Sequence, residues 1–211
     1  MNNIYVFDLD GTLVDSMPYF KKGILSIADE AGINYDDTLI KTLTPLGCLK
    51  GAEYYVNVLG VNDTVENIVF KIQSRLIYEY SNNIFTKPGV MEYLKRLYDN
   101  GSRLFVLTAS PHSIADVCLK HNKIFDLFES VWSVEDFGLS KSAPQIFYDV
   151  ASLIKCHPCE VNYFDDSLIA LENAKKAGFI TYGVYDSHSK QEIALMKEKF
   201  SNVVISFNEQ L

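Results

Sequence analysis

The chain is poor in the features that mark secreted, membrane-spanning and nucleic-acid-binding proteins. Its 211 residues include only four cysteines, and their spacing does not resemble the disulfide framework of a small secreted domain. No stretch approaches the roughly 18 consecutive apolar residues that suggest a membrane-spanning helix. Basic residues are scarce, since 19 Lys and Arg stand against 27 Asp and Glu for a net charge of −8. That balance disfavours a nucleic-acid partner, because binding to a phosphate backbone needs a basic face.

The beginning of the chain shows no targeting segment. An apolar strand pattern starts at Ile4, within the first few residues. A signal peptide would place a basic segment and a longer apolar segment before such a strand. We therefore expect no signal peptide, no membrane association and a cytoplasmic location.

Two of the cysteines, Cys156 and Cys159, form a C-x-x-C motif with His157 and Pro158 between them. A redox motif of this kind belongs to a strand-to-helix unit, whereas this one follows a helical pattern and precedes an apolar strand pattern. A zinc site would need two more soft ligands, and His157 supplies at most one. We interpret the motif as a loop between a helix and a strand.

The most informative stretch follows the first strand pattern. Ile4–Phe7 is an apolar run too short for a helix but long enough for a buried strand. The residues Asp8-Leu9-Asp10-Gly11 follow this run. They lie at the carboxyl end of the predicted strand, which is where open α/β sheets bind ligands. Gly11 permits a sharp turn and brings a backbone N–H close to a ligand. The two carboxylates, Asp8 and Asp10, repel each other, so we expect a cation beside them, and oxygen ligands suit Mg²⁺.

The remaining sequence divides into a helical part and an alternating part. Residues 17–83 carry amphipathic helical patterns with few strand signals. Residues 84–211 alternate helices with apolar strands, which indicates a doubly wound parallel sheet. We predict an α/β core of residues 1–16 and 84–211, Rossmann-like, with a small helical domain of residues 17–83 inserted in it.

Individual elements follow from the same patterns and from Gly, Pro and capping residues. The predicted strands are 4–7, 103–107, 131–132, 161–165, 179–184 and 203–205. The predicted helices are 17–31, 36–44, 52–59, 64–82, 90–99, 112–121, 145–155, 168–177 and 189–200. Between the second and third helices, residues 44–51 are predicted to form a loop.

A second strand end also carries polar residues. The strand 103–107 is followed by Thr108, Ala109, Ser110 and Pro111. Ser110 is a favourable N-cap and Pro111 a favourable first helical residue, and such a helix start can bind an anion. Capping accounts for Ser110 but not for Thr108. His112, the next residue, either touches the substrate or is a polar residue in an exposed first turn, and we expect the second.

These residues carry a resemblance to a known family. The segment Asp8-Leu9-Asp10-Gly11-Thr12-Leu13-Val14-Asp15-Ser16 resembles the first motif of the haloacid dehalogenase (HAD) superfamily of aspartyl phosphohydrolases. The resemblance implies that Asp8 is the nucleophile, which becomes an aspartyl-phosphate, and that Asp10 is the general acid and base. The dehalogenase branch lacks an acid at the second position, so Asp10 favours phosphoryl transfer over halide displacement.

The other three family motifs follow in order. Thr108 matches the hydroxyl residue that binds the phosphoryl group, and Lys141 matches the lysine that holds the charge of Asp8 and of that group. Asp166 matches a direct Mg²⁺ ligand and Asp165 a ligand that often binds through water, beside Asp8 and Asp10. The chain departs from the family pattern at three positions, where it has Ser for Pro, Gln for Asp and Ala for Asp: Ser142, Gln145 and Ala170.

The resemblance also implies how the substrate is held. In the family a helical cap at the position of residues 17–83 closes over the substrate and sets specificity. The loop 44–51 is the part expected to face the site, and Lys50 contacts a substrate anion or is a solvated surface lysine. Asp186 is expected at the surface. The residues expected to bind the substrate or its phosphate are Gly11, Thr108, Ala109, Ser110, Lys141 and Lys50.

We therefore expect a Mg²⁺-dependent phosphatase of a small phosphorylated metabolite, phosphoglycolate-like or a sugar phosphate, in the branch similar to phosphoglycolate phosphatase and β-phosphoglucomutase. A mutase remains an alternative, although β-phosphoglucomutase carries a His shortly after the first motif where this chain has Phe20. A non-catalytic binding module of the same fold is a second alternative. The sequence leaves the physiological substrate and the oligomeric state open.

Overall fold

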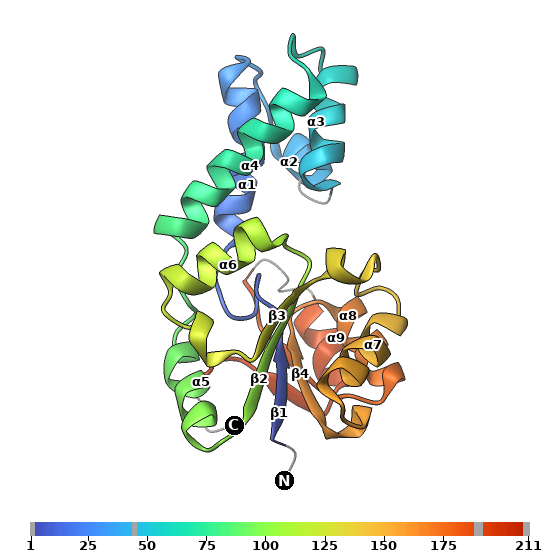
Figure 1. Cartoon of the computed structure of the whole chain (residues 1–211). Coiled ribbons are helices and arrows are strands. Elements are labelled where there is room, and N and C mark those ends of the chain that lie inside the picture. The colour runs from blue at the N-terminus through green and yellow to red at the C-terminus, as the bar shows by residue number, and fades with distance from the viewer. Residues whose placement is uncertain (1–2, 44–45, 188–191, 209–211) are drawn as a thin grey trace. The chain divides into compact units, whose positions relative to one another are not determined.

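The computed structural model describes residues 3–43, 46–187 and 192–208 (Figure 1). The chain forms two compact units, one made of Met1–Asp15 and Phe85–Leu211 and the other of Ser16–Ile84. These boundaries lie one residue from the division expected from the sequence. None of the helices in the described ranges is both long and apolar enough to cross a membrane.

The first unit contains a six-stranded parallel sheet. Its strands lie in the order β3-β2-β1-β4-β5-β6, with neighbouring strands parallel throughout. The order reverses at β1, which lies between β2 and β4, and such a switch point is where open α/β sheets bind ligands. The predicted doubly wound parallel fold is confirmed. The strands are β1 (Ile4–Phe7), β2 (Arg103–Thr108), β3 (Ser130–Ser133), β4 (Val161–Asp165), β5 (Ile180–Val184) and β6 (Asn202–Val204).

Helices cover both faces of this sheet (Figure 1). Successive side chains of a strand point to opposite faces. Accordingly Val6 joins an apolar cluster with α7 (Gln145–Ile154), α8 (Leu168–Ala177) and α9 (Glu192–Lys199). On the other face Phe7 lies 4.8 Å from Phe164 between ring centroids and meets Tyr93 edge-on. Tyr93 belongs to α5 (Val90–Asp99), and α6 (His112–His121) follows β2.

The second unit is a small helical bundle. Helix α4 packs against both α1 and α3. A side chain at Gly23 of α1 would place its Cβ 2.9 Å from Leu76 of α4, so glycine permits their close approach. Tyr55 of α3 is fully buried and donates a hydrogen bond of 2.9 Å to the backbone oxygen of Ile24. The helices are α1 (Met17–Glu30), α2 (Asp37–Leu43), α3 (Gly47–Asn57) and α4 (Val65–Asn82).

One predicted loop is wrong. Helix α3 begins at Gly47, not at Ala52, so residues 47–51 are helical. Gly47 was interpreted as a helix stop and Gly51 as the end of the loop, but Gly51 lies with Ala52 and Tyr55 on the buried side of α3. Glycine costs only about 1 kcal/mol in a helix, which tertiary packing can outweigh. Thr44 and Pro45, the first part of that loop, lie outside the described residues.

Most other elements agree with the sequence patterns within one or two residues. Thr64 caps α4 and accepts a hydrogen bond of 3.1 Å from the backbone N–H of Asn67. Helix α9 is described from Glu192 onward, whereas its predicted start at Ser189 lies outside the described residues. Short 3₁₀ turns in the described part of the chain include η2 (Phe125–Leu127), η3 (Val134–Phe137) and η4 (Pro158–Glu160).

The two segments of the first unit that adjoin the helical unit pair with each other. Val14 forms an antiparallel bridge with Thr86, and the backbone N–H of Lys87 donates to the oxygen of Leu13 at 2.8 Å. The amide oxygen of Asn122, on α6's C-terminal side, accepts from the backbone N–H of Thr86 at 2.9 Å. This pairing fixes where the chain leaves the sheet and returns to it.

The burial of α4 generates a matched stability prediction. Ile72 is fully buried, whereas Phe70 on the same helix is 67% exposed. We expect Ile72→Ala to lower the free energy of unfolding by about 2–5 kcal/mol, because it leaves a cavity. Phe70→Ala should change it by less than about 0.5 kcal/mol. Urea denaturation followed by circular dichroism measures both, and equal effects would contradict the packing described.

Candidate active site

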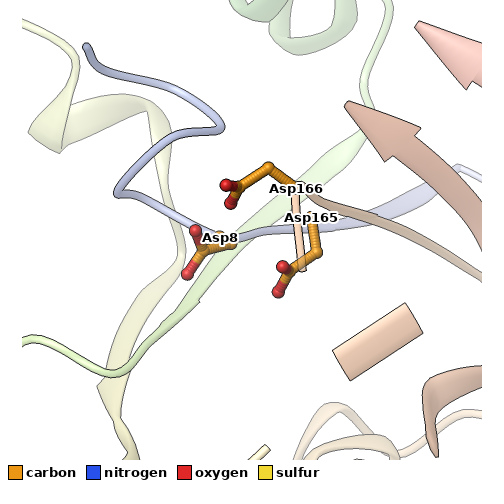
Figure 2. A group of neighbouring side chains, drawn as sticks. All are labelled: Asp8, Asp165 and Asp166. Carbon is orange, nitrogen blue, oxygen red and sulfur yellow. The ribbon is translucent and has the colours of Figure 1, made fainter. Parts of the chain in front are cut away.

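Three carboxylates meet at the carboxyl edge of the sheet. Asp8 directly follows β1, while Asp165 ends β4 and Asp166 follows it (Figure 2). Strands β1 and β4 are neighbours with Phe7 opposite Phe164, so the next residues of both strands come together. One carboxylate oxygen from each of the three residues lies within 4.8 Å of the others. The sheet register therefore builds a dense cluster of negative charge.

Lys141 supplies a positive charge to this cluster. Its Nζ donates to Asp8 Oδ1 at 2.5 Å and to Asp165 Oδ2 at 2.8 Å, and its side chain is only 12% exposed. The loop that carries Lys141 is held by Asn173 of α8, whose amide donates to the backbone oxygen of Ser142 at 2.9 Å. The side chain of Lys141 thus has a fixed position, because its loop and its amine are both held by hydrogen bonds.

Burial and charge shift the pKa values of these groups. Burial first, and then repulsion from Asp165, Asp166 and Asp10, raise the pKa of Asp8 well above its usual range, although Lys141 opposes the shift. Burial and the charge of Asp165 raise the pKa of Asp166 to about 7. Burial alone would lower the pKa of Lys141, but the two carboxylates it contacts outweigh burial and raise it. The cluster therefore has more negative charge than one lysine offsets.

Several hydrogen bonds hold the carboxylate of Asp165 in place. Besides Lys141, it accepts a short hydrogen bond from the hydroxyl of Tyr163 and one of 2.7 Å from the backbone N–H of Ser167. Asp165 and Tyr163 are both fully buried. These contacts orient Asp165 toward the amine of Lys141, and its expected role as a water-mediated metal ligand stays a prediction.

The turn after β1 depends on glycine. The backbone N–H groups of Leu13 and Val14 both bond to the oxygen of Leu9, which folds the chain back within a few residues. Gly11 has φ +79°, and a Cβ built there would lie 2.5 Å from Asp166 Oδ2. Glycine is therefore required twice, for its backbone conformation and for the close approach of Asp166.

The polar residues after β2 contact the same turn. Ser110 Oγ donates to Asp10 Oδ2 at 2.6 Å, and its backbone N–H donates to Thr108 Oγ1 at 3.0 Å. Thr108 is fully buried at the end of β2. The predicted N-cap role of Ser110 is wrong, because α6 begins at His112 and its N-cap is Pro111. The serine hydroxyl bonds to a carboxylate instead.

The other expected contact residues have different environments. Ala109 is exposed between Thr108 and Ser110. Lys50 is exposed on α3 in the helical unit, and its contact with a substrate stays a prediction. His112 is partly exposed, as expected. Its ring nitrogens lie 3.0 Å from Asp136 and 3.3 Å from Asp116. The hydrogen bond to Asp136 raises its pKa, partial burial opposes the shift and Asp116 adds to it.

Sequence reasoning missed a second ion pair at this edge. Asp186 was expected at the surface, but it is only 3% exposed and lies 2.9 Å from Lys87 Nζ. Lys87 also donates to the backbone oxygens of Gly11 and, at 2.9 Å, of Tyr185. A detectable signal existed, since Asp186 closely follows the end of β5, as the other acids follow β1 and β4.

The C-x-x-C motif lies in a loop, as predicted. Its second half forms the turn η4 between α7 and β4, and neither Cys156 nor Cys159 is part of a disulfide. The ring of His157 caps this turn by accepting from the backbone N–H of Cys159. A cap accounts for the histidine without a metal or redox role.

The fold thus places a group of three carboxylates at the strand-order switch point of an α/β sheet. A family model of haloacid dehalogenase-like hydrolases matches residues 5–184, and the chain belongs to that family. The match spans both units, so it agrees with the resemblance found in the motifs.

Individual relatives specify the type of enzyme. The chain is 23% identical to a validoxylamine A 7'-phosphate phosphatase from Streptomyces hygroscopicus subsp. limoneus, over 92% of this chain and 91% of the relative. It is 25% identical to a phosphorylated carbohydrates phosphatase from Thermotoga maritima, over 86% of this chain and 85% of the relative. These relatives and the family identify the chain as a HAD-type phosphomonoester hydrolase. The alternative of a non-catalytic module thus has no support.

Solved structures agree on the fold. A structure assigned as a β-phosphoglucomutase from Thermotoga maritima has a TM-score of 0.82 and is 24% identical, covering 95% of this chain and 93% of that chain. At this identity the likeness establishes the architecture, and the chemistry has to be argued from the site.

Gly11 is needed both for its backbone conformation and for the close approach of Asp166. We therefore predict that its replacement lowers activity as well as stability. Gly101 also has a left-handed φ, +75°, but nothing lies within 4 Å of a Cβ built there. Both Gly→Ala variants should lose about 1–2 kcal/mol of stability from the backbone conformation. Only Gly11→Ala should also displace Asp166 and reduce phosphatase activity by at least about tenfold. Denaturation curves and initial rates measure the two effects, and full activity of Gly11→Ala would contradict the described contact.

Proposed function

We propose that the chain is a Mg²⁺-dependent phosphatase that hydrolyses a small phosphorylated metabolite, a sugar phosphate or a phosphoglycolate-like compound, through an aspartyl-phosphate on Asp8. The observation that carries the proposal is the buried Asp8 carboxylate at the end of β1, with Lys141 Nζ at 2.5 Å. The relatives named as phosphatases of carbohydrates and of validoxylamine A 7'-phosphate support a phosphorylated small molecule as substrate.

The donor set fits magnesium. Mg²⁺ prefers oxygen ligands and is usually held by one or two carboxylates together with waters and substrate phosphate. The side chains of Asp8 and Asp166 and the backbone oxygen of Asp10 would hold it, and the missing side chain of Gly11 lets the Asp166 carboxylate lie close to this turn. Burial, and then the charge of neighbouring carboxylates, raises the pKa values of Asp8 and Asp166, and a bound divalent cation would offset that negative charge. When bound, Mg²⁺ neutralises charge on the phosphoryl oxygens.

In the first proposed step, an oxygen of Asp8 attacks phosphorus and the bond from phosphorus to the leaving oxygen breaks. Asp10 gives its proton to that leaving oxygen, so an alcohol departs rather than an alkoxide. The amine of Lys141 stabilises the negative charge on Asp8 and on the phosphoryl oxygens. Thr108 accepts from Ser110, and its hydroxyl proton can therefore be donated to the phosphoryl group.

In the second step, water attacks the phosphorus of the aspartyl-phosphate. Asp10, now a carboxylate, takes a proton from that water, and the bond between phosphorus and the Asp8 oxygen breaks. Inorganic phosphate leaves, Asp8 is regenerated as a carboxylate and Asp10 is again protonated. Asp10 thus acts as an acid in the first step and as a base in the second.

We further propose, from the family resemblance, that the helical unit Ser16–Ile84 acts as a cap that selects the substrate. Closure of such a unit excludes water from the reacting groups. Lys50 on α3 is its candidate contact to a substrate anion.

A phosphomutase is the alternative, and the structural likeness to a β-phosphoglucomutase is the observation that favours it. A mutase returns the phosphoryl group to a sugar instead of to water. Phe20 occupies the position where that family member carries a His, which favours hydrolysis. Incubation with β-glucose 1-phosphate distinguishes the two, since a mutase accumulates glucose 6-phosphate and a phosphatase releases inorganic phosphate.

The role of Asp8 predicts that Asp8→Asn abolishes turnover. An amide is a far weaker nucleophile than a carboxylate, so we expect kcat/KM to fall at least about a thousandfold, about 4 kcal/mol of transition-state stabilisation. Asp15→Asn is the matched control, because Asp15 is an exposed acid in the same motif. Phosphate release by both variants is the measurement, and appreciable activity of purified Asp8→Asn would refute the covalent mechanism.

The metal requirement and the substrate are tested together. We expect phosphate release from a panel of several dozen phosphorylated metabolites to stop with EDTA and to return when Mg²⁺ is added. A substrate about a hundredfold above the others in kcat/KM, roughly 2.7 kcal/mol of discrimination, would identify the physiological class. Undiminished release with EDTA would contradict the metal proposal.

A further inference from the structure

Ser110 contacts the acid that the mechanism uses twice. Its Oγ lies 2.6 Å from Asp10 Oδ2, a length typical of a hydroxyl that donates to a charged oxygen. The two residues come from different segments, since Asp10 follows β1 and Ser110 follows the neighbouring strand β2. The hydrogen bond therefore connects two strand ends that are about one hundred residues apart in the chain.

Helix capping does not account for this hydroxyl. Ser110 precedes Pro111, the N-cap residue of α6, and no side-chain capping bond is made there. Ser110 is also fixed independently of Asp10, because its backbone N–H donates to Thr108 Oγ1 at 3.0 Å. Thr108 is fully buried at the end of β2. The donor is thus preorganised by the sheet rather than by the helix.

The hydrogen bond distinguishes the two oxygens of Asp10. A hydroxyl can donate both to a carboxylate oxygen and to the carbonyl oxygen of a carboxylic acid. Oδ2 can therefore accept from Ser110 before and after Asp10 transfers its proton. The proton then moves on and off Oδ1, and the carboxyl group need not rotate between the two steps.

We propose that Ser110 is a positioning residue that holds the carboxyl group of Asp10 in one orientation for proton transfer to the leaving oxygen. This inference rests on the proposed function. It differs from a contact between Ser110 and the phosphate, because a phosphate contact would assist every phosphomonoester equally. A group that acts through Asp10 assists only those substrates whose leaving oxygen needs a proton.

Substrates with different leaving groups distinguish the positioning of Asp10 by Ser110 from a contact between Ser110 and the phosphate. An alkyl phosphate must release an alcohol, so its cleavage needs the acid, whereas p-nitrophenolate is a stable anion that leaves without a proton. kcat/KM reports the steps through the first irreversible one, which here is formation of the aspartyl-phosphate and loss of the leaving group. The comparison uses p-nitrophenyl phosphate and the alkyl phosphate that the wild-type chain hydrolyses with the highest kcat/KM.

We expect Ser110→Ala to lower kcat/KM for the alkyl phosphate at least about tenfold, and for p-nitrophenyl phosphate by no more than about twofold. Ser110→Thr, which keeps a hydroxyl, should recover most of the difference. Ser152→Ala, on an exposed position of α7, is the matched control and should leave both values unchanged. Circular dichroism checks that each variant folds.

The decisive quantity is the ratio of the two losses in Ser110→Ala. A ratio of about five or more supports the inference, and a smaller ratio overturns it, whether both rates fall together or neither falls. The proposed function fails differently, because wild-type protein would then release no phosphate from either compound, or Asp8→Asn would retain activity. Wild-type activity that depends on Asp8, with equal losses in Ser110→Ala, would refute the Ser110 role alone.

Discussion

The structure of the site depends on like charges held together in a buried place. Asp8, Asp165 and Asp166 bring carboxylate oxygens within 4.8 Å of one another, and Lys141 forms ion pairs with Asp8 and Asp165. Removing such groups from water favours their neutral forms, which explains the raised pKa values of Asp8 and Asp166. In the proposed mechanism, a bound divalent cation would offset the negative charge of this cluster. The electrostatic cost of the cluster and the proposed chemistry therefore come from the same carboxylates.

The surrounding contacts keep this charged cluster in one geometry. Tyr163 and the backbone N–H of Ser167 orient Asp165, which in turn fixes the amine of Lys141. Gly11 lets the turn after β1 pass close to Asp166, and Lys87 binds the backbone oxygen of that turn. Each reactive group is thus supported by residues from another strand or helix, so the site has little freedom to relax away from its strained arrangement.

Patterns in the amino-acid sequence predicted much of the fold and of the candidate site. The short apolar runs that end in Asp8, Thr108 and Asp165 predicted both the strands and the edge where their polar residues meet, because parallel strands place their carboxyl ends together. The same reasoning failed where packing outweighed local preference. Gly51 was assigned to a loop but is buried within α3, and Ser110 was interpreted as a cap but bonds to Asp10. Asp186 was assigned to the surface, although its place just after β5 was a signal for the same edge of the sheet; its pairing with Lys87 is a tertiary contact.

Periodicity and short motifs with fixed spacing were sufficient to predict the parallel α/β architecture and the family. The contacts between individual side chains follow only from the three-dimensional packing of the chain. Lys141 reaches Asp8 across more than a hundred residues, and Ser110 reaches Asp10 from the adjacent strand. Such contacts depend on strand order, register and side-chain direction in three dimensions, and local sequence preferences do not encode them.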